Sequence, residues 1–179
     1  MSIESLDQTI NYWIKALENY SLIELRAKPS PASWSLGQVY FHLIDNTRYY
    51  IEQAKICLAT DDNIGDKASP EGVTMLANNE FPDTMIQGPD TNVNVPQPTS
   101  KHELVNSLME LKKGLGVLAT VMSDSPYRGK TKHPGLGYFC ADDWVHFADM
   151  HFRHHLRQKN RIDDFLRAVE ARSDAFLKL

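Results

Sequence analysis

One long segment toward the C-terminal end of the sequence has mostly apolar residues at alternating intervals of four and three. This spacing favours an α-helix with one face packed against other helices. Its intervals run four, three, four, three, four, three and four through Trp144, Ala148, His151, His155, Gln158, Ile162, Phe165 and Val169. At about 100° per residue, these side chains share one band of a helix. The spacing predicts a helix over 141–171 whose band must be covered by other helices.

Three other segments have the same periodicity and can supply that cover. The first spans 3–26, with its apolar face at Ile3, Leu6, Ile10, Trp13, Leu17 and Tyr20. The second spans 35–60 and the third begins after Ser100, and each opens with the spacing of a capping box. The third has its apolar face at Leu104, Leu108, Leu111, Leu115 and Leu118. The second follows the rhythm at Val39, His42, Asn46, Tyr49, Gln53 and Ile56, which is more polar than a plain core face.

The segment 61–99 separates the second and third helices and is irregular. It contains several prolines and many Asn and Asp residues, with a short helix expected only near 71–78. No segment alternates as a strand does. We therefore predict an all-α four-helix bundle, one domain over 1–179, with a long loop between the second and third helices.

Composition excludes several classes of protein. The formal net charge is -4, so there is no basic excess to neutralise nucleic acid or an anionic membrane. No apolar run reaches the roughly 20 residues that span a bilayer, and the N-terminal stretch lacks the features of a signal peptide. Cys57 and Cys140 have no framework spacing and are expected to be free thiols. We expect a cytoplasmic protein that binds neither nucleic acid nor membrane.

Two histidines on the apolar band of the last helix need an explanation. His151 and His155 lie one turn apart, and two buried imidazoles have donors and acceptors that must be satisfied. A divalent cation would accept a lone pair from each ring. His42, on the mixed face of the second helix, is the best third ligand. The alternative is that these histidines are hydrogen-bonded core residues.

The other histidines are weaker candidates. His154 is a rival for either partner, but it lies off the band by roughly 70°. His146 is expected at the surface or the flank of the helix, and His102 in solvent. His133 precedes Pro134 in a glycine-rich segment, where a turn residue is favoured over one that lines the mouth of the site.

Three stretches of sequence, SWSLGQVYFHLIDN, MHFRHHLRQ and HPGLGYFCADDW, resemble the DinB-like superfamily of metal-binding four-helix bundles. The resemblance implies the bundle fold and the metal ligands His42, His151 and His155. Members of the family include thiol-dependent transferases and isomerases, and others described as hydrolases. The segment 61–99 matches none of these motifs.

Together these features lead us to expect an enzyme with an open position on a three-histidine metal centre. Zinc and nickel are the first candidates for the divalent ion, ahead of iron, cobalt and copper. Asp45 and Gln158 are candidates to orient ligands from outside the coordination shell. The expected partner is a small molecule such as a low-molecular-weight thiol, and a homodimer is a further expectation. Arg153, Arg157 and Arg161 form a row that could attract the carboxylates of such a thiol, but a solvated face that pairs with Asp and Glu is favoured. The alternatives are a non-catalytic metal-binding or stress-response bundle, and a helical interaction protein with a degenerate site.

Overall fold

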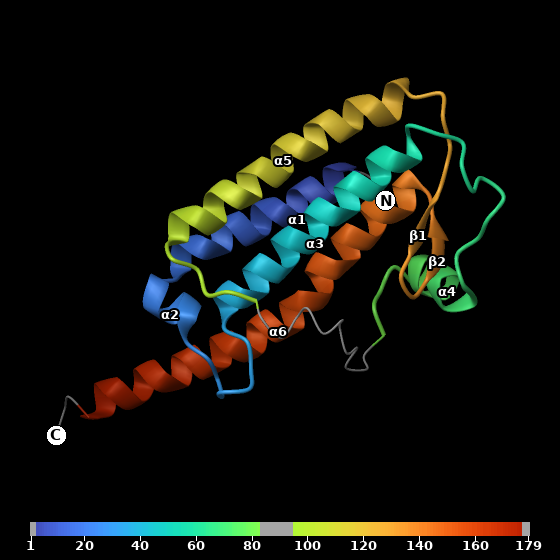
Figure 1. Cartoon of the computed structure of the whole chain (residues 1–179). Coiled ribbons are helices and arrows are strands. Elements are labelled where there is room, and N and C mark those ends of the chain that lie inside the picture. The colour runs from blue at the N-terminus through green and yellow to red at the C-terminus, as the bar shows by residue number, and fades with distance from the viewer. Residues whose placement is uncertain (1–2, 83–94, 177–179) are drawn as a thin grey trace.

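Four long helices make up most of the computed structural model, which describes residues 3–82 and 95–176, with side chains through Ala171. They are α1 (Ile3–Ala16), α3 (Leu36–Cys57), α5 (Lys101–Asp124) and α6 (Ala141–Phe176). Figure 1 shows them lying side by side along one direction, with the C-terminal part of α6 extending past the others. The predicted four-helix bundle is confirmed.

The order of the helices around the bundle is not the order of the sequence. α6 packs against α1 and α3, and α5 packs against the same two helices. The pairs α1 with α3 and α5 with α6 therefore occupy opposite corners. In an up-and-down bundle, by contrast, consecutive helices are neighbours.

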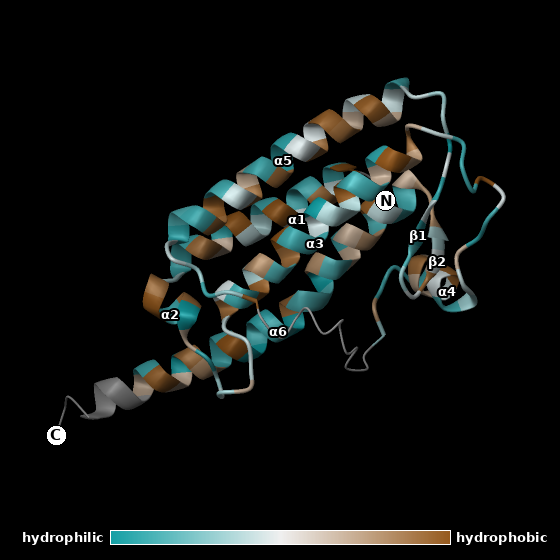
Figure 2. Cartoon of the chain, viewed as in Figure 1, coloured by the Kyte–Doolittle hydropathy of each residue, from teal (hydrophilic) through white to brown (hydrophobic). Residues whose placement is uncertain are grey.

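The core is formed largely by the apolar faces that the sequence predicts on α1, α5 and α6. The prediction is wrong for Val169, the last residue of the band on α6, which is 43% exposed. Leu6, Ile10, Trp13 and the five leucines of α5 are buried. Figure 2 shows apolar and polar residues interleaved along each long helix, as an amphipathic helix requires.

The face predicted for α3 is wrong in its second half. Tyr49 and Ile56 are 41% and 46% exposed, whereas Tyr50, Ile51 and Ala54 are buried. The physical reason is that α3 contacts both α5 and α6, so its buried surface is wider than one stripe and is centred on other positions.

The first predicted helix is also corrected, because it is not continuous over 3–26. α1 ends at Ala16 and is followed by a 3-10 turn, η1 (Leu17–Asn19), and by α2 (Leu22–Arg26). Ser21 starts α2 with a capping box: its hydroxyl accepts from the Glu24 backbone N–H, and its own N–H donates to the Glu24 carboxylate. This local alternative competes with helix continuation.

A hairpin that the sequence analysis did not predict lies before α6. Its strands β1 (Thr131–His133) and β2 (Gly137–Phe139) pair antiparallel. Residues 67–69 lie beside it: Tyr138 N–H donates to Lys67 O at 3.0 Å, and Ser69 N–H donates to Leu136 O at 2.8 Å. Gly137 has a φ of 77°, which favours glycine. Three-residue strands are too short to show alternation.

The connection between α3 and α5 contains the expected short helix, α4 (Pro70–Asn78), capped by Ser69. Residues 83–94 of the predicted loop lie outside the described part of the chain. No helix within 3–82 and 95–176 has the length and apolar character needed to cross a membrane.

Candidate metal centre

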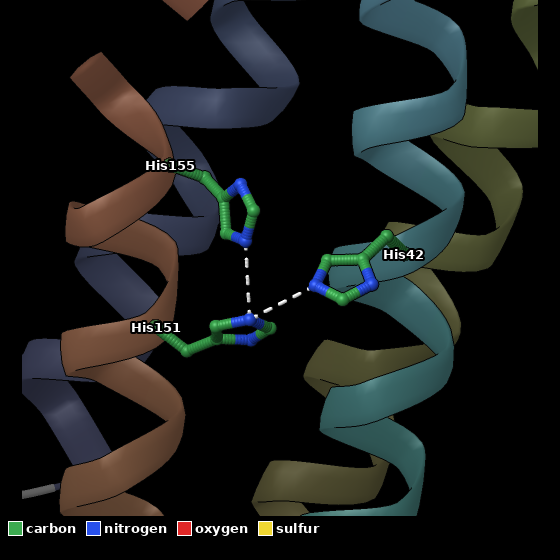
Figure 3. Close-up of side chains that lie close together, drawn as sticks. All are labelled: His42, His151 and His155. Carbon is green, nitrogen blue, oxygen red and sulfur yellow. Dashed lines mark hydrogen bonds between the residues drawn. The ribbon is translucent and has the colours of Figure 1, made fainter. Parts of the chain in front are cut away.

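Three imidazoles meet at the interface of α3 and α6. His42 comes from α3, His151 and His155 come from successive turns of α6, and all three are buried. The Nε2 atom of His151 lies 3.0 Å from Nε2 of His42 and 3.1 Å from Nε2 of His155. Figure 3 shows the three rings with these nitrogens directed toward one another. The structure therefore brings together the three residues that the sequence singles out.

His155 has the tautomer that a metal ligand needs. Its Nδ1 lies 2.9 Å from Oε1 of Gln158, one turn along α6, so Nδ1–H donates to the amide oxygen. Its Nε2 then has a lone pair that faces Nε2 of His151. This is the arrangement in which a neighbouring acceptor orients a metal-binding imidazole.

His42 also contacts a polar neighbour on its own helix. The Asn46 amide nitrogen donates to the His42 carbonyl oxygen at 2.7 Å and lies 3.2 Å from Nδ1 of the ring. Tyr50, one further turn along, donates to the Asn46 side-chain oxygen at 3.4 Å. These contacts restrict the rotation of the His42 ring.

Burial keeps the two imidazoles of α6 neutral. Loss of hydration lowers the pKa of His151 well below its usual value, and the neighbouring His155 and His42 lower it further. Loss of hydration, followed by the charge of His42, lowers the pKa of His155 to about 3. Near pH 7 both rings are therefore uncharged, as metal ligation requires.

Aromatic rings surround the cluster. Trp34 lies with its ring centroid 5.0 Å from that of His42, and Tyr50 and Phe81 lie 5.9 Å and 5.8 Å from His151. The sequence analysis did not identify these rings as part of the site. Trp34 is the one with a sequence signal, because it stands beside the capping residue of α3 within a motif of the resemblance.

The other candidate residues lie elsewhere. Asp45 is at the surface, where its carboxylate pairs with Arg48 at 3.2 Å and its side chain is 64% exposed. His154 is not one of the three clustered histidines, and its ring stacks on Phe81 with centroids 5.0 Å apart. The structure thus brings Gln158, but not Asp45, to the three imidazoles.

The remaining histidines have separate environments. His102 is exposed in the first turn of α5. His146 is half-buried, and its Nε2 lies 2.7 Å from Oδ1 of Asn79. His133 packs among Phe139, Trp144 and Phe147, where loss of hydration lowers its pKa to about 4.

The chemistry of the cluster fits a divalent ion. Three ring nitrogens, one from each histidine, lie within 4.8 Å of one another. Hydrogen bonds among the rings satisfy such a cluster poorly, whereas a cation accepts every lone pair directed at it. Three protein ligands also leave at least one coordination position for an exchangeable ligand.

Comparison with known proteins gives a family and a fold. Residues 5–158 match the model of the DinB superfamily. The structure resembles that of YfiT from Bacillus subtilis, a probable metal-dependent hydrolase with an unusual four-helix bundle topology. The TM-score is 0.58 at 16% sequence identity, over 94% of this chain and 85% of that one. No curated protein is similar enough in sequence to count as a relative.

Proposed function

This chain belongs to the DinB superfamily, and from that premise we propose that it is a metal-dependent enzyme whose divalent ion is held by His42, His151 and His155. The observation that carries the proposal is the convergence of three buried ring nitrogens from two helices, with 3.0 Å and 3.1 Å between neighbouring atoms. An arrangement of three imidazoles with an open position is typical of catalytic sites, because structural sites use all positions for protein ligands.

The ion would supply a nucleophile, since a bound water or thiol loses its proton near neutral pH. The protein would supply orientation and a dry environment. Gln158 holds the His155 ring through Nδ1, and Asn46 holds His42. The aromatic rings of Trp34, Tyr50 and Phe81 exclude water from the sides of the cluster.

Two reactions follow from this chemistry. With water in the open position the reaction is hydrolysis of a small molecule; YfiT is described as a probable metal-dependent hydrolase. With a low-molecular-weight thiol it is transfer of sulfur to an electrophile. Recruitment of an anionic thiol by arginines has limited support, because Arg153 bonds to Asp149 and Asn79, and Arg157 bonds to Glu80.

The alternative is a bundle that binds a metal without catalysis, for example in a stress response. Zinc and nickel remain our first candidates for the ion, because three imidazoles suit both, ahead of iron, cobalt and copper. Residence in the cytoplasm and assembly into a homodimer remain predictions.

The test is a screen of the metal-loaded protein against panels of small esters, amides and thiol–electrophile pairs. Turnover that His42→Ala abolishes and that Asp45→Ala leaves unchanged would support catalysis at the centre. Asp45→Ala is the matched control, because Asp45 is on the same helix but at the surface. Turnover that persists in His42→Ala would contradict the proposal, and full metal occupancy without turnover would favour the non-catalytic alternative.

A further inference from the structure

The residue after α4 has an unusual backbone conformation. Asn79 has φ 55° and ψ 34°, in the left-handed region that few residues other than glycine adopt. It ends α4 and turns the chain toward α6. Two residues later comes Phe81, whose ring lies 5.8 Å from the ring of His151 and 5.0 Å from those of His154 and Phe147.

The side-chain oxygen and the backbone oxygen of Asn79 both accept hydrogen bonds from side chains of α6. Nη2 of Arg153 donates to its Oδ1 at 2.6 Å, and Nη1 of the same guanidinium donates to its backbone oxygen at 3.0 Å. Nε2 of His146 lies 2.7 Å from the same Oδ1. A planar guanidinium with two donors on one residue fixes both its position and its orientation.

The Arg153 guanidinium is also held by a contact on its other side, with Asp149. Its Nε donates to Oδ2 of Asp149 at 3.0 Å, and Asp149 is 1% exposed. Oδ1 of Asp149 accepts a hydrogen bond from Thr9 on α1 at 2.6 Å. The chain of contacts therefore runs from α1 through Asp149 and Arg153 to Asn79, and a buried carboxylate of this kind is kept in place by its donors.

We propose that Asn79, Arg153 and Asp149, here called the α4 clamp, position Phe81 against the metal centre and so control how fast its ion and exchangeable ligand leave. The proposal rests on the proposed metal function. Arg153 is a positioning residue, because its guanidinium bonds to Asn79 and Asp149 and the contact with His151 is made by Phe81. Loss of these bonds would let the residues after α4, and with them the Phe81 ring, shift away from His151.

The experiment uses the zinc-loaded full chain and follows transfer of zinc to a coloured chelator. Asn79→Gly keeps the left-handed turn and removes the amide, so it isolates the side-chain bonds from the backbone. Arg153→Lys keeps the charge beside Asp149 and loses the two-pronged contact with Asn79. Phe81→Ala removes the ring itself.

Two further variants serve as controls. Leu118→Val, in the core on α5, controls for loss of stability, and Arg48→Lys controls for substitution of an exposed arginine.

We expect zinc release to quicken by about tenfold in Asn79→Gly and Arg153→Lys, the scale set by loss of a charged hydrogen bond. Phe81→Ala should quicken release at least as much, because it removes the ring through which the clamp acts. The double variant Asn79→Gly/Phe81→Ala should release zinc no faster than Phe81→Ala alone, because the clamp acts through the ring. Both controls should release zinc as the wild type does. Hydrogen exchange over 70–81 should increase in Asn79→Gly whether or not zinc is bound.

Unchanged release in the clamp variants, with zinc retained by the wild type, would overturn this inference and leave the proposed function standing. Additive effects in the double variant would also overturn it, since the clamp would then act by another route. A wild type that binds no divalent ion would overturn both proposals together.

Discussion

At the scale of single residues, the centre depends on side chains that hold the imidazoles as much as on the imidazoles themselves. Gln158 orients His155, and Asn46 contacts His42, each from its own helix. The Gln158 oxygen keeps His155 in the tautomer with a free lone pair on Nε2, and the Asn46 contact restricts the rotation of the His42 ring. Neighbouring histidines with the same chemistry but another direction on the helix should therefore bind no metal.

His155→Ala should remove most of the metal affinity, whereas His154→Ala should retain it. The reason is that His155 is directed at the other two rings while His154 stacks on Phe81. Calorimetric titration with zinc or nickel measures both variants. Equal losses of affinity would show that the two-histidine assignment on α6 is wrong.

Stability of the metal-free protein should fall as the pH falls below about 6.5. The pKa of His155 is lowered from 6.5 to about 3, so between these values the unfolded chain takes up a proton that the folded chain does not. The stability that is complete above 6.5 is then lost at up to about 1.4 kcal/mol per pH unit as the pH falls toward 3.

Urea unfolding in the presence of a chelator, at several pH values, checks this slope. His155→Gln keeps a polar side chain that does not titrate and should make the curve shallower, while the contributions of His151 and His133 remain. Parallel curves for the two proteins would contradict the assigned pKa.

At the scale of elements, capping determines where the helices of the site begin. The hydroxyl of Ser35 accepts from Gln38 N–H, while Ser35 N–H donates to the Gln38 side chain, and both residues are buried. α3 therefore starts at a fixed point, with its capping residue seven positions before His42. The register of His42 against α6 follows from that start.

Ser35→Ala should destabilise the protein by about 1–2 kcal/mol, because the buried cap is lost. Ser21→Ala removes the equivalent cap of α2, where the residues are exposed, and should cost less. Chemical unfolding of the two variants compares them directly. A larger loss in Ser21→Ala would mean that capping of α3 has little effect on the fold.

The sequence predicted the elements that depend on local signals and missed those that depend on distant contacts. The starts of α3 and α5 follow from Ser35 and Ser100, and the short α4 was expected near 71–78, although its cap Ser69 and its Pro70 were signals left unused. The hairpin could not be predicted, because its strands are held partly by residues 67–69, far away in the sequence. The contact of Phe81 with His151 was missed for the same reason, because the two residues are far apart in the sequence.

At the scale of the whole molecule, the bundle has a large apolar core in addition to the residues of the metal centre. Trp13, Tyr40, Phe152 and the leucines of α5 are fully buried or nearly so, and the Tyr40 hydroxyl donates to Trp13 O at 2.8 Å. Helix packing of this extent stands without an ion. The four-helix bundle was predictable from the four periodic segments. The placement of α1 and α3 at opposite corners was not, because periodicity does not determine which helices are neighbours.

Removal of the metal by a chelator should lower the stability without unfolding the chain. The expected loss is roughly 3 kcal/mol at an ion concentration a hundredfold above Kd. Thermal unfolding followed by circular dichroism, with and without the chelator, measures the shift. Complete unfolding of the chelated protein would indicate a structural metal in place of a catalytic one.

The most direct test of the central claim is elemental analysis of the purified, tag-free protein beside His42→Ala and His151→Ala. We predict close to one divalent ion per chain in the wild type and almost none in either variant, because each variant removes one of three ligands. A wild type without metal after incubation with zinc or nickel, or variants that keep the ion, would contradict the account.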